Sequence, residues 1–305
     1  MTVDHRVRVA AFHWLKEQVR IHGDVLPRAL LAQGFEWEGQ RVPLLGPQGI
    51  FKPKILPQVP LTITTTPKGP YDDSFGVDGF LLYRYRGTDT QHRDNAGLRA
   101  ALFRRTPLIY FHGVVPGKYL AAWPVFIVGD EPERLTFKVA LEDPSYVQES
   151  WQKEDEGLPL ADPEADARRA YLTGSVRYRL HQRGFRERVL HAYKEQCAFC
   201  RLRHRDLLEA AHIIPDGEPQ GEPIVSNGIS LCKLHHAAFD KYFLGVTPDY
   251  VIEVRRDILE EEDGPMLMHG LKELHGQRIY APRSDRSRPN PDFLDWRYQR
   301  FRKAM

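Results

Sequence analysis

The sequence predicts a mixed α+β protein with at least two domains, and three observations support this fold class. Apolar side chains recur at helical spacing near the N-terminus. Residues 43–142 carry short apolar runs separated by Gly, Pro and Asp, which is typical of an all-β domain. Residues 167–305 return to helical patterns around a paired-cysteine segment. A chain of 305 residues has room for two domains of ordinary size.

Residues 1–42 predict a small helical leader. Gly23 marks the end of its first helix, a second helix is expected around residues 26–33, and a hairpin is expected to turn at Glu38-Gly39. Two helices and a hairpin can bind DNA as a winged module, or they can simply pack against the next domain. The first helix is indicated by apolar residues at helical spacing: Val7, Ala10, Ala11, Trp14, Leu15 and Val19.

The region of residues 43–142 is expected to form a barrel or a sandwich, because short apolar runs recur between turn-forming residues. One helical pattern, NAGLRAALFR at 95–104, interrupts these runs. The runs that predict strands are LTITTT (61–66), GFLLYRY (79–85), LIYFHGVV (108–115), AAWPVFIV (121–128) and LTFKVAL (135–141).

An acidic segment separates the two halves of the chain. Residues 142–166 contain nine acids, one lysine and three prolines, a composition that suits a solvated connector. We therefore place a linker at residues 143–166. Residues 167–193 then predict a basic helix that leads into the first cysteine pair.

Positive charge is concentrated in two regions, although the formal net charge is only +2. Residues 168–205 hold eleven Arg or Lys and two acids, and a second basic cluster lies near the C-terminus. Such clusters attract phosphate backbones through counterion release, or they are ordinary solvated faces. The second cluster comprises Arg283, Arg286, Arg288, Arg297, Arg300, Arg302 and Lys303.

Membrane and secreted proteins are disfavoured by the sequence. No apolar run reaches the roughly 18 residues that indicate a membrane span. The N-terminus lacks the apolar core of a signal peptide, so we expect a cytoplasmic location and no membrane partner. Three cysteines are an odd number for a disulfide framework, and metal ligation is the natural alternative.

The cysteines occur in two metal-ligand spacings. Cys197 and Cys200 form a Cys-x-x-Cys pair, and Cys232 and His235 form a Cys-x-x-His pair. Together they supply four soft or borderline ligands, the set that tetrahedral Zn²⁺ prefers. Four protein ligands leave no open position, so this zinc is expected to be structural. The alternative is three unrelated buried thiols.

The candidate chemistry lies in His212, Asn227, His236 and Asp240. If LHHAAFDKYF forms a helix, His236 and Asp240 share one face, where an imidazole and a carboxylate can hold a divalent cation. His212 lies in EAAHIIP, a short apolar β segment. A histidine there is either an ordinary buried residue beside the zinc or part of a metal-supported active site.

The order AAHIIP, then SNGISLC-x-x-HH-x-x-x-D, bracketed by Cys-x-x-Cys, resembles the HNH (ββα-metal) nuclease motif, and in particular that of modification-dependent restriction enzymes. The resemblance implies that His212 is the general base and that Asn227 fixes the loop and orients that histidine. It implies that His236 ligates the catalytic cation, with Asp240 as a further ligand. Many family members carry Asp or His just before the base, where this chain has Ala211, so water or another side chain must take that place.

The implied reaction is phosphodiester hydrolysis with one catalytic cation. His212 would take a proton from the attacking water, and the cation would stabilise the phosphate and the departing 3′ oxygen. A mixed, water-rich ligand set favours Mg²⁺ or Mn²⁺.

The segment GPYDDSFGVDGFLLYRYRG, residues 69–87, places tyrosines around several acids. Aromatic faces can stack on an extruded base and a carboxylate can accept a hydrogen bond from cytosine N4, although both residue types are also common in ordinary β domains. With GPQGIFKP before it and RDNAGLRAALFRRTPLIYF after it, the segment resembles SRA domains, PUA-like β-barrels that flip modified cytosine out of the duplex. The resemblance implies that Tyr71 and Tyr83 sandwich the base and that Asp73 reads its Watson–Crick edge.

The combined expectation is a modification-dependent (type IV-like) restriction endonuclease that acts on double-stranded DNA carrying 5-methylcytosine or 5-hydroxymethylcytosine. Residues 43–142 would be the SRA-like reader and residues 167–305 the HNH nuclease domain. One HNH site cuts one strand, so a homodimer is expected, at least on DNA. The alternatives are a non-catalytic reader of modified DNA and an HNH nuclease without modification specificity.

Overall fold

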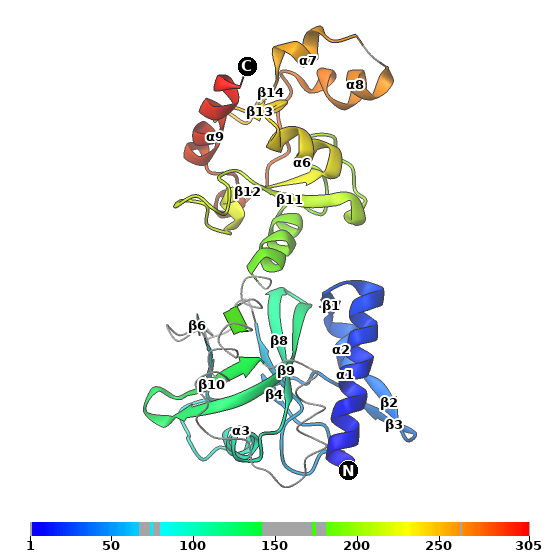
Figure 1. The fold of residues 1–305 in the computed structure, drawn as a ribbon, viewed down its shortest axis with the longest axis vertical. Coiled ribbons are helices and arrows are strands. Elements are labelled where there is room, and N and C mark those ends of the chain that lie inside the picture. The colour runs from blue at the N-terminus through cyan, green and yellow to red at the C-terminus, as the bar shows by residue number, and fades with distance from the viewer. Residues whose placement is uncertain are drawn as a thin grey trace. The chain divides into compact units, whose positions relative to one another are not determined.

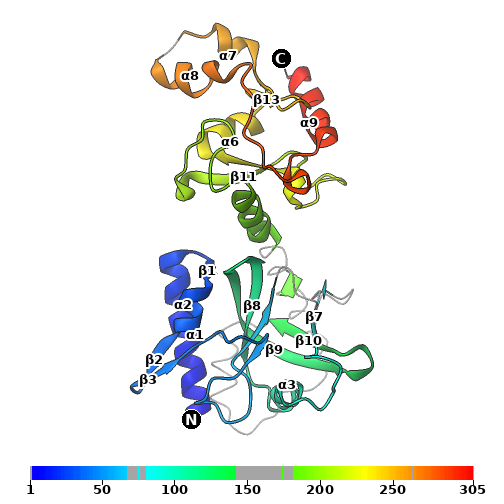
Figure 2. The same cartoon turned by 180° about the vertical axis from the view of Figure 1, so that it is seen from behind.

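The computed structural model describes residues 2–66, 74–75, 80–141, 173–174, 181–262 and 264–304. The chain divides into two compact units, Met1–Leu180 and His181–Met305, and each is considered by itself (Figures 1 and 2). Tyr71, Asp73 and the expected linker at 143–166 lie outside the described residues. Among the described helices, none combines the length and the apolar character that crossing a membrane requires.

The predicted leader elements are all present. Helix α1 (Val3–His22) begins where the Thr2 hydroxyl accepts a hydrogen bond from the His5 backbone, and it ends at Gly23, whose positive φ of 75° favours glycine. It is followed by β1 (Val25–Pro27), α2 (Arg28–Gln33) and the hairpin of β2 (Phe35–Trp37) and β3 (Gln40–Val42).

The leader packs against the sheet of the same unit. One face of α1 shares an apolar cluster with the strand residues Ile109 and Phe111. Arg8 is fully buried and donates to the backbone carbonyls of Pro60 (2.8 Å) and Pro107 (3.0 Å). The buried guanidinium therefore holds the helix to two loops of the β region. This contact corresponds to the second interpretation of the leader, in which it packs against the β domain.

The described part of the first unit holds an eight-stranded, curled sheet with the order β4-β5-β8-β9-β10-β7-β6, and β1 pairs with the long strand β9. Each run that predicted a strand contributes a strand to this sheet, and 95–104 lies in a helix, as expected. The bounds are β4 (Ile50–Phe51), β5 (Thr62–Thr65), β6 (Ser74–Phe75), β7 (Leu81–Arg84), α3 (Arg93–Arg104), β8 (Leu108–Val115), β9 (Lys118–Glu131), a 3-10 turn at Pro132–Arg134 and β10 (Thr136–Leu141).

The continuous apolar character of β8 follows from burial on both faces. Leu108 and Tyr110 lie in a cluster with Leu98 of α3. The alternate residues Ile109 and Phe111 lie in the cluster that contains α1. Successive side chains of a strand point to opposite faces, so a strand covered on both faces needs an unbroken apolar run.

The second unit is built on a strand–strand–helix core of β11 (Leu208–His212), β12 (Gly228–Cys232) and α6 (Lys233–Asp240). β11 and β12 are antiparallel, and His212 pairs with Gly228. The other described elements are the helical residues 181–192, β13 (Leu244–Val246), β14 (Ile252–Val254), α7 (Arg256–Glu260), α8 (Pro265–Gly270), α9 (Pro291–Lys303) and 3-10 turns at Arg205–Leu207, Val225–Asn227, Lys272–Leu274 and Asp285–Ser287.

Gly228 is required by the helix that crosses these strands. A Cβ atom added at Gly228 would lie 2.4 Å from a Val189 methyl and 2.8 Å from the Phe185 ring. Both side chains belong to the helical residues 181–192. The missing side chain therefore lets Phe185 reach the strand pair beside His212.

Candidate active site and metal centre

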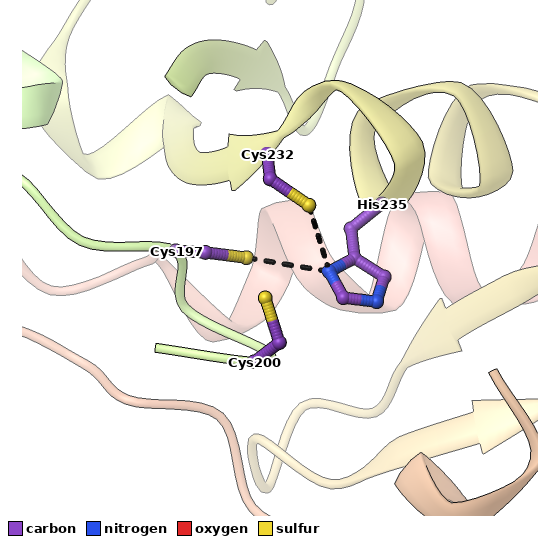
Figure 3. A group of neighbouring side chains, drawn as sticks. All are labelled: Cys197, Cys200, Cys232 and His235. Carbon is purple, nitrogen blue, oxygen red and sulfur yellow. Dashed lines mark hydrogen bonds between the residues drawn. The ribbon is translucent and has the colours of Figure 1, made fainter. Parts of the chain in front are cut away.

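The four predicted zinc ligands come together. The ligand atoms of Cys197, Cys200, Cys232 and His235 all lie within 4.8 Å of one another, and no other such group of His, Cys, Asp or Glu occurs in the described part of the chain. Figure 3 shows the three sulfurs directed toward the His235 ring. The Nδ1 atom lies 3.4 Å from the Cys197 sulfur and 3.2 Å from the Cys232 sulfur.

Two local structures place these ligands. Cys232 ends β12 and caps α6, so His235 follows within the first turn of the helix. The loop with Cys197 and Cys200 is tied to the same strand, because the Ala198 N–H donates to the Ser230 carbonyl at 2.7 Å. Both pairs are therefore anchored to β12.

The donor set fits tetrahedral Zn²⁺. Nε2 of His235 lies 2.7 Å from the Gly270 carbonyl, which suits a ring that donates from Nε2 and presents Nδ1 to a metal. Burial lowers the pKa of His235, but hydrogen bonds with the three cysteines and Gly270 outweigh it and raise the pKa to about 12. A site this rich in electron-pair donors favours a cation.

His212 ends β11 and is half-buried, with its ring stacked on Phe185 at a centroid distance of 4.0 Å and an angle of 17°. Its Nε2 is buried and has no hydrogen-bond partner. Burial lowers the pKa of His212 below its ordinary value of 6.5, and the nearby charges of Asp216, His236 and Asp240 modulate it. The imidazole is therefore neutral near pH 7, as a general base must be.

Asn227 holds the chain that follows His212. Its side-chain oxygen accepts from the Ile214 N–H at 2.9 Å, and its amide donates to the carbonyls of Ile214 and Glu222 at 3.0 Å each. Asn227 is fully buried. These bonds hold the backbone two residues beyond His212.

His236 and Asp240 share one face of α6, with His236 Nε2 and Asp240 Oδ2 3.2 Å apart. Ligands on one octahedral cation, each about 2.0–2.1 Å from it, lie at comparable separations, so the pair fits Mg²⁺ or Mn²⁺. Burial raises the pKa of Asp240, but its bonds and charge interactions with His236 and Arg297 hold it below the ordinary value. Asp240 is therefore anionic at neutral pH.

Glu209 lies beside the candidate site and was not singled out from the sequence. Its Oε2 lies 2.7 Å from His236 Nδ1, on the opposite side of the ring from Asp240. A carboxylate on one ring nitrogen fixes the tautomer that presents the other nitrogen to a metal. The sequence shows only that Glu209 is an acid in a short apolar segment, and its contact with His236 depends on the packing of β11 against α6.

Ala211 is fully buried in the core, and its methyl side chain offers no metal ligand. The acidic side chain that β11 brings to His236 is Glu209 instead, two residues earlier.

The expected base pocket is described only at Tyr83. Tyr83 is 5% exposed in β7, within the core of the first unit, and its hydroxyl donates to the Thr64 carbonyl at 3.4 Å. Its partners in the expected pocket, Tyr71 and Asp73, lie outside the described residues, so the pocket stays a prediction.

The basic segments are partly neutralised. In the basic segment of residues 168–205, Arg205 pairs with both acids, Glu187 and Glu195. Within the C-terminal cluster, Arg297 is only 5% exposed and pairs with Asp240. Counting charges in the sequence therefore overstates the free positive surface.

Among the comparisons with known proteins, a family model matches the segment that holds these residues. The family model for HNH endonuclease matches residues 197–247. The solved structure of a modification-dependent TagI restriction endonuclease is similar, with 16% identity, coverage of 93% of this chain and 89% of that chain, and a TM-score of 0.31. The type IV phosphorothioation-dependent restriction endonuclease ScoMcrA is 17% identical over 58% of this chain and 52% of that chain, with a TM-score of 0.21. No curated protein matches. Residues 197–247 of this chain are an HNH endonuclease domain.

Proposed function

We propose that this protein is a modification-dependent restriction endonuclease that hydrolyses phosphodiester bonds of double-stranded DNA near a modified cytosine. The observation that carries the nuclease part is the placement of His212, neutral and without a hydrogen-bond partner on Nε2, in the domain that holds the His236–Asp240 pair.

The residues of the chain take distinct parts in this reaction. A ring nitrogen of His212 accepts the proton of the attacking water. Asn227 fixes the loop after His212, and Glu209 fixes the tautomer of His236. His236 and Asp240 would hold a divalent cation, which would supply positive charge to the phosphate and the departing 3′ oxygen.

The pH dependence of cleavage tests His212 as the base. The imidazole accepts a proton only when neutral, and burial lowers its pKa below 6.5. At saturating Mn²⁺ the rate should therefore hold as pH falls to 6.5 and decline only below it. Steady-state nicking rates measured between about pH 5 and 9, a range that brackets a histidine pKa, give this pH dependence. A decline centred above pH 6.5 would contradict the assignment, and the residual activity of His212→Ala should lack the decline.

For target choice, we propose that the first unit binds 5-methylcytosine or 5-hydroxymethylcytosine flipped from the duplex, with Tyr71 and Tyr83 on its faces and Asp73 on its Watson–Crick edge. The support is the resemblance of residues 44–142 to SRA domains, together with a curled sheet that carries Tyr83 in β7. We further propose that two copies act together to cut both strands.

One plasmid prepared with cytosine, 5-methylcytosine or 5-hydroxymethylcytosine tests this target. A methyl group in an apolar pocket contributes about 1–3 kcal/mol, so modified plasmid should be cut about 10–200-fold faster than unmodified plasmid. Asp73→Asn should reduce binding of the flipped base. The matched control is Asp89→Asn, because Asp89 is an exposed aspartate before α3. Equal cutting of all three plasmids would indicate a nuclease without modification specificity.

A further inference from the structure

Arg297 is a buried cation that joins both halves of the candidate site from outside the matched segment. It lies on α9, fifty residues beyond residue 247, where the family match ends. Its side chain is 6% exposed. A cation this deeply buried, in a cluster expected to face solvent, requires a specific set of partners.

Those partners belong to the two elements that carry the site. On the strand side, Nη1 donates to the carbonyls of Ile213 at 3.1 Å and His212 at 3.4 Å. On the helix side, Nη2 donates to the Phe239 carbonyl at 2.9 Å and to Asp240 Oδ1 at 3.0 Å. One planar guanidinium therefore bonds the end of β11 and the end of α6 at the same time.

Two aromatic rings fix the plane of this group. The guanidinium carbon lies 4.0 Å from the ring centroid of Phe239 and 5.2 Å from that of Tyr242. Stacking and forked donation together define its orientation, which the single ammonium of lysine cannot reproduce.

The geometry at Asp240 has a consequence for the cation. Arg297 occupies Oδ1, while Oδ2 lies 3.2 Å from His236 Nε2. The carboxylate is thereby turned so that one oxygen faces the imidazole ligand and the other faces the guanidinium. The same guanidinium sets how far this oxygen lies from the backbone of His212.

We propose that Arg297 is a positioning residue of the nuclease site: it orients Asp240 to bind the catalytic cation through Oδ2 and fixes the spacing between that cation and His212. This role rests on the proposed nuclease function. A clamp that only stabilises the fold would make the same contacts, so the test must separate stability from cation binding.

Direct Mn²⁺ binding to the zinc-loaded full chain provides that separation. The variants are Arg297→Lys, which keeps the charge but loses the fork, and Arg297→Met, which keeps a long apolar side chain. Arg300→Met is the matched control, because Arg300 lies three residues further along α9. Calorimetric titration with Mn²⁺ and thermal unfolding are measured on each folded variant.

Outer partners of metal ligands typically contribute about 10–100-fold to metal affinity. Arg297→Lys should therefore weaken Mn²⁺ binding by about tenfold or more while the folded fraction stays near that of the wild type. Arg300→Met should leave it unchanged. Because Arg297 acts through Asp240, adding Arg297→Lys to Asp240→Asn should produce little further weakening.

Wild-type Mn²⁺ affinity in folded Arg297→Lys would overturn the proposal, as would full additivity with Asp240→Asn. If Arg297→Met does not fold, the Mn²⁺ affinity of Arg297→Lys alone tests the proposal. Failure of the proposed function would give a different result, because the wild-type protein would bind Mn²⁺ but would not nick any DNA. If only this inference is wrong, the wild-type protein nicks DNA and the Arg297 variants keep the wild-type Mn²⁺ affinity.

Discussion

Replacing His212 by alanine is expected to lower the rate of DNA nicking by about 10²–10⁴-fold, the usual contribution of a general base. The imidazole stacks on Phe185, its pKa is lowered by burial, and its Nε2 makes no hydrogen bond. The alanine variant keeps the zinc ligands and the Asn227 contacts with Ile214, which do not involve the ring. Binding to DNA should therefore persist, as measured by gel shift without divalent cations.

The matched control for this variant is His269→Ala. His269 lies in α8, and its side chain is 69% exposed. Its loss should change neither nicking nor DNA binding. Nicking by His212→Ala at the wild-type rate would remove His212 from the mechanism, and equal losses in both variants would point to a general effect on folding.

Replacing Cys232 by serine is expected to unfold or strongly destabilise the second unit. Cys232 lies between β12 and α6 and is a member of the four-ligand group. Zinc binding contributes about 10–16 kcal/mol in small zinc domains, and removing one thiolate forfeits a large part of it. In calorimetry of the full chain, the unfolding transition of residues 181–305 should shift down or disappear while that of the first unit remains.

Lys233→Ser is the matched control for this substitution, since Lys233 is the exposed neighbour of Cys232 in α6. It should retain one zinc per chain and the wild-type transition. Elemental analysis measures the zinc content of both variants. A Cys232→Ser protein with full zinc content and wild-type stability would contradict the structural role of the cluster.

The sequence predicts those parts of the site whose ligands lie close together along the chain. Cys-x-x-Cys and Cys-x-x-His pairs turn locally around one ion, and His236 and Asp240 share a helix face by spacing alone. The same holds for β8, whose apolar residues 108–111 reflect burial against α1 and α3. Periodicity is a local property, and local structure follows from it.

Contacts between distant elements could not be predicted in this way. Glu209 contacts His236 only because β11 lies against α6. Arg297 has the appearance of one more surface arginine in a basic cluster, yet it bonds to residues 57 and 84 positions away. The partner of a buried charge is set by packing, which sequence spacing does not encode.

The most direct test of the nuclease assignment is incubation of supercoiled, cytosine-modified plasmid with the zinc-loaded protein in Mg²⁺ or Mn²⁺. We predict that open-circular DNA accumulates with either cation, that chelation stops the reaction, and that His212→Ala forms open-circular DNA about 10²–10⁴-fold more slowly at matched protein concentration. Intact plasmid after incubation of the folded wild-type protein with both cations would contradict the assignment and leave a protein that only binds DNA.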